Sequence, residues 1–414
     1  MLPGGLLRDP DFLKLWFGQA VSRIGSQVTL VGVPLTAILL LGASPLQMGA
    51  LAGVSAAPVL LFGLFAGAWA DRLRRRPILI AADLGRAAVL AVIPLAAMLG
   101  RLTMTHLYVV ATLSGFLTVL FDVSYQAYLP SLVERENIVE GNSRLALTES
   151  LAEIAGPSLT GALVQLITAP MAILCDAVSF AASAVSLWLI RKPEPPPTRA
   201  LAPHMGREIA EGLRTVWRDP LLQPLAGRSA MAAFFLGFGS SLYFLFVTRE
   251  LGLTAVLLGL VISAGGLSNL AGAFLAGRIA SRWGVGRTLV GSALVIGLAM
   301  LAVPLARGSV AVCTAILIAS QLCDAAWPVF SINQTSLRQA ITPHHLLGRV
   351  NAATHLLFHG ILPLGALAGG AIAEAIGARN TLLMAACAIL LSTLWLVCSP
   401  VRCLRDLPTA PVGP

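Results

Sequence analysis

Residues 67–77 read GAWADRLRRRP and stand between two long apolar runs. The segment starts with a small residue, which would let two helices approach each other closely. An acid then enters a short basic turn, where its carboxylate can bind neighbouring guanidinium groups or cap the positive end of a nearby helix. We interpret the segment as a charged loop between two membrane-spanning helices, the alternative being a plain basic loop. The candidate loop residues are Gly67, Asp71, Arg72, Arg75 and Arg76.

The apolar runs continue along the whole chain. Hydrophobic residues make up 57% of the 414 positions and charged residues only 11%, whereas soluble domains carry roughly 25% charged residues. A helix needs about 20 apolar residues to cross a bilayer. Twelve such runs are present, which predicts an all-α membrane protein of twelve transmembrane helices. The runs cover about 16–41, 46–70, 78–99, 106–128, 145–167, 171–190, 226–247, 255–277, 288–306, 309–332, 350–375 and 380–399.

The basic residues indicate the orientation. The net charge of +9 does not indicate nucleic-acid binding, because the Lys and Arg residues fall in loops between apolar spans. With both termini in the cytoplasm, all but six of the 28 Lys and Arg residues lie in cytoplasmic segments. This bias predicts cytoplasmic termini. The exceptions are Arg101, Arg249, Arg307 and Arg379 outside, and Arg23 and Arg86 within spans.

One long connection divides the chain into halves. We expect an N-terminal bundle over 1–190, a cytoplasmic linker over 191–225, a C-terminal bundle over 226–399 and a tail over 400–414. Prolines near 193–197 should stiffen the linker. An amphipathic helix should follow and lie on the membrane surface, or it could bind a partner. Its apolar face would hold Ile209, Leu213, Val216 and Trp217.

The two halves share landmarks at a nearly constant spacing. This repetition predicts two parallel six-helix bundles with a substrate site between them near the midplane of the membrane. The matched pairs are Gly67 and Gly277, Arg72 and Arg282, Phe121 and Phe330, Asn142 and Asn351, Gly156 and Gly365, and Gly161 and Gly370.

The charged loop resembles the cytoplasmic signature of the major facilitator superfamily, G-x-L-A-D-R-x-G-R-R-x-R/K. Arg74 stands where that pattern has glycine, and Ile78 where it has a basic residue. A second copy over 277–287 has Ser281 in place of the acid. The resemblance implies the major facilitator fold and a loop around Asp71 that latches one conformation.

Further segments resemble the branch of that superfamily that contains the enterobactin exporter and the macrolide efflux proteins. They are FLKLWFGQAVSRIGSQVTLVGVP at 12–34, ADLGRA at 82–87, DVSYQAYLP at 122–130 and DAVSF at 176–180. The resemblance implies a bacterial inner-membrane protein that exports bulky amphipathic molecules in exchange for protons. We expect it to act as a monomer. Gly156, Pro157 and Gly161 resemble the antiporter motif and could let helices rock, although the same pattern also serves plain helix packing.

Ionisable residues within spans are costly and mark candidate functional sites. We consider Asp122 and Glu153 the first candidates for proton coupling, with Glu149 a weaker one. The alternative interpretation makes such charges fixed ion pairs, and we favour it for Asp83 and Arg86, one helical turn apart. The intramembrane charge partners are Arg23, Asp83 and Arg86, and Asp176 and Asp324 also fall within spans. Between His106 and Tyr128 there is no basic residue of the kind that related drug antiporters often carry.

Several polar residues could line the central cavity, although hydrogen bonding within the core is the alternative role for each. They are Tyr125, Gln126, Asn333, Gln334, His355 and His359. His355 and His359 lie one turn apart, but no Cys, Asp or Glu follows at a metal-binding spacing, so we expect no metal and no cofactor. The sequence G-x-x-x-x-G-K-[S/T] is absent, which argues against ATP-driven transport.

These features together favour a secondary transporter, not an enzyme, that exports an amphipathic drug, siderophore or secondary metabolite. One alternative is a nutrient uptake transporter of the same fold, which should carry a denser polar cavity. Another is a non-transporting membrane sensor or scaffold, which should carry a soluble signalling domain. We therefore expect the partners to be a small-molecule substrate, protons and the lipid bilayer.

Overall fold

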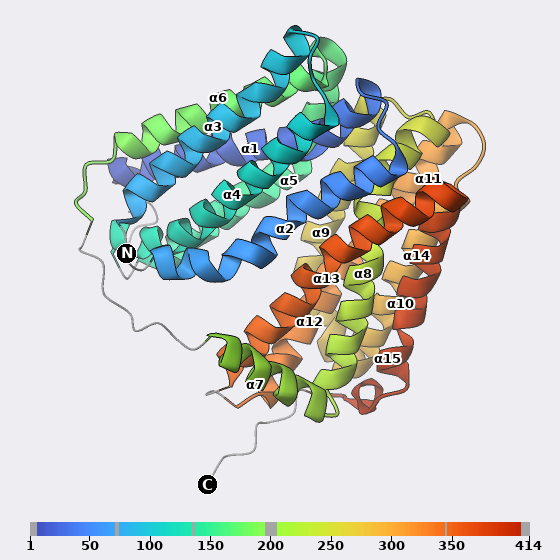
Figure 1. Ribbon diagram of the computed structural model, residues 1–414. Helices are drawn as coiled ribbons and strands as arrows, with labels where there is room; N and C mark the ends of the chain where they lie inside the picture. Colours follow the sequence, from blue (N-terminus) through green and yellow to red (C-terminus); the bar gives the residue numbers. More distant parts are fainter. Residues whose placement is uncertain (1–5, 71–73, 135–136, 195–204, 344–345, 407–414) are drawn as a thin grey trace. The chain divides into compact units, whose positions relative to one another are not determined.

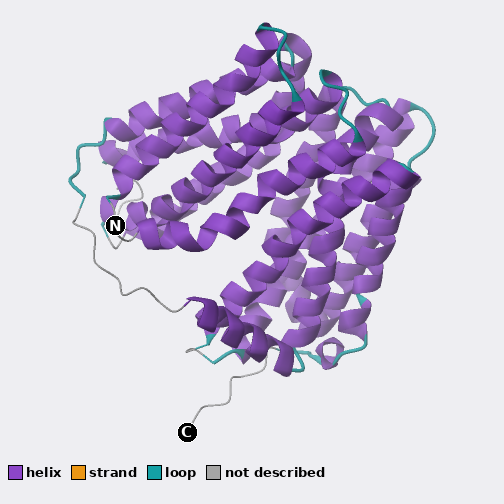
Figure 2. Cartoon of the chain, viewed as in Figure 1, coloured by secondary structure: helices purple, strands orange, loops and turns teal. Residues whose placement is uncertain are grey.

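The computed structural model describes residues 6–70, 74–134, 137–194, 205–343 and 346–406. All regular elements in these ranges are helices, and none is a strand (Figure 2). Twelve spans are long and apolar enough to cross a membrane. Many large apolar side chains on them are exposed, among them Leu166 and Trp188, as expected of helices that face lipid. The predicted all-α membrane fold is confirmed.

The chain forms two compact units. The first consists of Met1–Gln47, Val54–Ala202 and Thr254–Ser263, and the second of Met48–Gly53, Pro203–Leu253 and Ala264–Pro414. Each unit therefore holds most of one predicted half, with short pieces of α2 and α9 grouped with the other unit.

Six long helices form the first unit (Figure 1). The Asp9 carboxylate caps the first of them by accepting the amides of Asp11 at 2.9 Å and Phe12 at 3.3 Å. Gly42 and Gly100, both with positive φ, turn the chain after α1 and α3. The helices are α1 Pro10–Leu39, α2 Pro45–Ala70, α3 Arg75–Met98, α4 Met104–Leu132, α5 Ile138–Ile167 and α6 Ala169–Trp188.

The second unit also has six spans, one of which is built from two helices. The 3₁₀ turn η4, Cys323–Ala325, separates α11 from α12 within the span Val310–Ile341. The helices are α8 Leu222–Leu245, extended by the π-helical η3 Phe246–Glu250, then α9 Ala255–Trp283, α10 Val285–Leu305, α11 Val310–Leu322, α12 Ala326–Ile341, α13 Leu347–Ile376, α14 Ala378–Ser392 and α15 Leu394–Val397, followed by the 3₁₀ turn η5 Pro400–Cys403.

The amphipathic segment of the linker forms α7, Met205–Arg218. Val216 is fully buried in a cluster with Leu222, Ala226 and Val350. Glu211 forms an ion pair with Arg349 at 2.8 Å. The helix therefore packs on the end of α13, a contact that we did not expect, while Trp217 stays half exposed.

Candidate functional site

An arginine near the middle of α1 lies close to carboxylates from two other helices. Arg23 Nη2 lies 3.3 Å from Asp122 Oδ1 of α4, and its Nη1 lies 3.4 Å from Glu149 Oε1 of α5. All three side chains are partly exposed, with Glu149 the most accessible at 52%. The structure thus brings together three of the ionic candidates, with one cation between two carboxylates.

Glu153 lies one turn beyond Glu149 on α5 and is exposed. Among the described residues it makes no ion pair. Pro157 follows four positions later within the same helix and has no amide hydrogen to donate to the Glu153 carbonyl. Glu153 is therefore an accessible acid beside the ionic cluster, at a point where the helical hydrogen bonding is interrupted.

Asp83 and Arg86 form a second ion pair on α3, and both are buried, at 0% and 4% exposure. The Arg86 guanidinium lies 4.4 Å from the centre of the Phe121 ring and 4.0 Å from that of Phe180. A cation between two ring faces and a carboxylate is held on several sides. This enclosure fits a fixed structural pair.

Asp176 of α6, noted above only as an acid within a span, is fully buried against α1. Its carboxylate accepts hydrogen bonds from the Thr29 hydroxyl and, at 2.9 Å, from the Ser179 hydroxyl. Gly25 leaves the room for it, because a Cβ there would lie 2.9 Å from the Cβ of Ser179. In the sequence, the hydroxyl residues Thr29 and Ser179 are possible partners for an acid within a span. Only the packing of α6 on α1 shows that they bind Asp176.

The small residues of α5 lie against two different helices, α1 and α9. Gly156 and Pro157 are buried, and a Cβ on Gly156 would lie 2.5 Å from Cγ of Gln27. Gly161 is buried against the backbone of α9, where a Cβ on it would lie 3.0 Å from Cα of Val256. In the second unit, Gly365 lies in the same way against the backbone of Phe234 on α8. Gly156 and its match Gly365 therefore permit equivalent close helix contacts in both units, which is compatible with packing and with rocking.

Only part of the charged loop at 67–77 lies within the described residues. Gly67 lies in α2, whereas Asp71 and Arg72 lie outside the described residues. The backbone amides of Arg75 and Arg76 donate to the Glu194 carboxylate at 2.6 and 3.1 Å. Glu194 therefore caps the amino end of α3, where unpaired amides and the helix dipole favour an anion.

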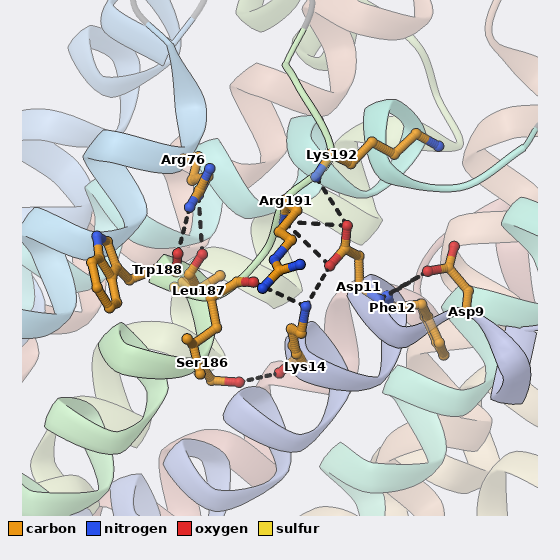
Figure 3. A network of polar contacts seen from close by, with 11 residues as sticks. Asp9, Asp11, Phe12, Lys14, Arg76, Ser186, Leu187, Trp188, Arg191 and Lys192 are labelled. Carbon is orange, nitrogen blue, oxygen red and sulfur yellow. Dashed lines mark hydrogen bonds and ion pairs between the residues drawn. The ribbon is translucent and has the colours of Figure 1, made fainter.

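Arg76 also joins this helix end to α6. Its Nε and Nη2 donate to the Leu187 and Trp188 carbonyls at 3.0 and 2.6 Å. Figure 3 shows these contacts beside a related group, in which Asp11 of α1 accepts the amides of Arg191 and Lys192. The ends of α1, α3 and α6 and the first linker residues are thus held by charged side chains on backbone groups.

The predicted cavity residues divide into three groups. Asn333 is buried and donates to the Val329 carbonyl at 2.8 Å, while Gln334 donates to the Ser229 hydroxyl at 2.9 Å. Tyr125 is partly buried and stacks on Phe121 at 5.7 Å. The exposed members are Gln126 and His355, and the His355 ring lies 4.2 Å from the His359 ring, between centres, in a tilted arrangement.

The sequence analysis did not identify Arg228 of α8 as a buried charge. It is 2% exposed, and its guanidinium carbon lies 3.7 Å from the centre of the Phe330 ring. Neither Nε nor Nη2 has a hydrogen-bond partner among the described residues. Sequence reasoning placed Arg228 at the edge of a span, where an arginine is usually solvated.

The fold and the intramembrane charges define a multi-pass membrane transporter. A model of the Major Facilitator Superfamily matches residues 15–362. The chain belongs to this superfamily, which confirms the resemblance carried by residues 67–77. Its members are transporters and not enzymes.

Three similar proteins come from bacteria. The multidrug efflux pump Tap of Mycolicibacterium fortuitum is 26% identical over 91% of this chain and 92% of its own length. The enterobactin exporter EntS of Citrobacter koseri is 25% identical over 84% and 81%. Macrolide efflux protein A of Streptococcus pyogenes is 24% identical over 96% and 97%.

Among solved structures, an inward-facing bacterial homologue of the iron transporter ferroportin shares the fold. Its TM-score is 0.73, and the match covers 95% of this chain and 98% of that one at 19% identity. Similarity at this level of identity supports the fold alone.

Proposed function

We propose that the chain exports amphipathic small molecules in exchange for protons by alternating access. The superfamily supplies the transporter class. Three relatives are named for efflux or export, which supports the outward direction. Both termini are then cytoplasmic, as the placement of the Lys and Arg residues indicates.

The Arg23 cluster carries this proposal. One guanidinium lies within 3.4 Å of two carboxylates, and the exposed Glu153 stands one turn away on α5. Charge within a span is costly unless it is balanced. Three acids beside one arginine leave excess negative charge, which bound protons would balance.

The coupling step follows from this imbalance. When an acid of the cluster is protonated, Arg23 pairs with the remaining carboxylate. When that acid opens to water on the other side, it releases its proton and competes for Arg23 again. Asp122 and Glu153 are the first candidates for the titrating acid, and Glu149 is the third.

Two further parts complete the proposal. Buried Gly156, beside Pro157, provides the close helix contact on which α5 and α1 rock. The loop with Asp71 latches one conformation at the cytoplasmic surface. The protein works as a monomer, since each element of the scheme lies within one chain.

Everted membrane vesicles test the coupling. With an acid interior, wild-type protein should accumulate a lipophilic fluorescent dye, and dissipating the pH gradient should abolish the accumulation. Asp122→Asn and Glu153→Gln should each lose most of this gradient-driven uptake, because neither amide can carry the proton.

Glu140→Gln is the matched control. It removes an acid from the same helix, where Glu140 pairs with Arg144 at 2.7 Å, and it should transport like the wild type. Undiminished gradient-driven uptake in Asp122→Asn, Glu153→Gln and the double variant would disprove the coupling assignment. Uptake into right-side-out vesicles instead would overturn the direction.

A further inference from the structure

The broken span of the second unit places an acid in the middle of the membrane-spanning region. Asp324 lies in the 3₁₀ turn η4, between α11 and α12. The other acids in described spans of this unit lie at span ends, with Glu250 at the last position of Leu222–Glu250 and Glu374 near the end of Leu347–Ile376. The Arg23 cluster does not involve Asp324.

Pro328 explains where the helix breaks. A proline has no amide hydrogen for the carbonyl four residues earlier, and its ring clashes with that carbonyl. The residue four positions before Pro328 is Asp324. The sequence therefore interrupts the helix at the acid itself.

The α9 helix stabilises the break. The Ser268 hydroxyl donates to the Leu322 carbonyl at 2.5 Å and accepts the Ala325 amide at 2.8 Å. Backbone groups that a break exposes within a membrane need such partners. A Cβ on Gly272 would lie 2.7 Å from Cα of Ala325, so glycine lets the two backbones approach. Contacts with α9 therefore hold the helix break in place.

Two polar side chains beside the break, Asp324 and Tyr243, have no hydrogen-bond partner among the described residues. Asp324 is partly exposed, and no ion pair or hydrogen bond to its carboxylate occurs among the described residues. A Cβ on Gly265 would lie 3.2 Å from Asp324 Oδ2 and 2.6 Å from Gln321 Nε2, so both side chains converge on that bare glycine. The Tyr243 hydroxyl is enclosed and, within the described part of the chain, unpartnered, and Tyr243 lies within electrostatic range of Asp324.

We propose that Asp324, with Gln321 and Tyr243, binds the charged group of a lipophilic organic cation. An accessible carboxylate supplies the countercharge, and the tyrosine ring offers an electron-rich face. A hard metal ion would need more oxygen ligands, and the described residues contain no group of three metal-binding side chains. The inference rests on the proposed export function and assigns cations as a substrate class.

Binding to the purified full-length protein in detergent tests this site without any proton gradient. The probe is tetraphenylphosphonium, whose charge does not depend on pH, and equilibrium dialysis measures its affinity. Asp324→Asn should weaken binding by about tenfold or more, because the lost charge pair lies in a partly desolvated site. Asp324→Glu should bind within a few-fold of the wild type, and Tyr243→Leu, which removes the aromatic face, should lose a few-fold.

Two controls make the result specific. Glu250→Gln removes an acid of the same unit at a span end, where Glu250 pairs with Arg379 at 3.3 Å, and it should bind like the wild type. Triphenylphosphine oxide, a neutral compound of similar size, should bind wild type and Asp324→Asn equally. Equal tetraphenylphosphonium affinity in wild type and Asp324→Asn, or no binding to wild type, would overturn the proposal.

A second measurement covers the case in which Asp324→Asn does not fold. A hydrophobic carbodiimide should modify Asp324 in the wild type, and tetraphenylphosphonium should protect it, as read by mass spectrometry of the peptide. Unchanged modification would refute the site. Failure of proton-driven export in vesicles leaves both binding results intact, so the two proposals fail separately.

Discussion

Thr168 adopts a backbone conformation that side chains rarely tolerate. It joins α5 to α6 with φ 84° and ψ 155°. Gly377, at the matching point between α13 and α14, has φ 85° and ψ 157°. Such a conformation is almost restricted to glycine and costs other residues about 1–3 kcal/mol. The first unit therefore carries strain at a position where the second unit has none.

We predict that Thr168→Gly raises the free energy of unfolding by about 1 kcal/mol, since relief of strain exceeds the entropy cost of glycine. Thermal unfolding of the purified protein in detergent should show a higher midpoint. The reverse change, Gly377→Thr, should lower it. A lower midpoint for Thr168→Gly would show that Thr168 is not strained.

The buried pair on α3 depends on both of its members. Arg86→Met should destabilise the protein by about 3–5 kcal/mol, because it leaves the Asp83 carboxylate buried without a cation. Replacing both residues, as Asp83→Leu with Arg86→Met, should recover much of that loss. Thermal unfolding measures both effects.

Arg144→Met is the matched control for this prediction. Its pair with Glu140 is partly exposed, so its loss should cost less than about 1 kcal/mol. If Arg86→Met were no more harmful than Arg144→Met, the Asp83 carboxylate would not depend on Arg86.

At the scale of the element, Glu194 holds the start of α3 from a position far along the chain. Glu194→Gln should weaken this cap by about 1 kcal/mol, through loss of the charge that faces the helix dipole. Hydrogen exchange should then quicken at the amides of Arg75 and Arg76 while α4 stays unchanged. The exposed Glu134 provides a control, Glu134→Gln, without this effect. Equal exchange in both variants would exclude the cap.

The helices show which structural features can be predicted from this sequence. The spans follow from apolar runs of about 20 residues, so α10 Val285–Leu305 lies close to the predicted 288–306. The break at Asp324 was missed because Pro328 lies inside an unbroken apolar run. Glu194 as a cap was missed because it lies 119 positions from Arg75 in the chain. Contacts of that kind depend on packing, which periodicity does not report.

The same limits apply to the candidate site. The sequence predicts Arg23, Asp122 and Glu149 as charges within spans, and the structure pairs them. The sequence alone could not separate Asn333, whose amide satisfies a helix carbonyl, from residues that face open space. A side chain's partners decide between these roles, and they come from other helices.

At the scale of the whole molecule, the two units share a scaffold but not its charges. Phe121 and Phe330 are matched positions, and each lies against a buried guanidinium. In the first unit the cation comes from α3 and is paired with Asp83. In the second it is Arg228 of α8, two of whose nitrogens find no hydrogen-bond partner in the described part of the chain. The repeat therefore preserves the aromatic position and changes the electrostatics around it.

Cysteine labelling can test the orientation of the whole chain in the membrane. The placement of Lys and Arg predicts that the loop between α2 and α3 and the C-terminal tail face the cytoplasm, and that the loop between α3 and α4 faces outward. Arg74, Arg101 and Cys403 are exposed positions in these three segments. In a background without the other cysteines, Arg101→Cys should react with an impermeant maleimide in intact cells. Arg74→Cys and native Cys403 should react only in everted vesicles. The opposite pattern would reverse the proposed topology, and with it the export direction, because the pH gradient would then act on the other face.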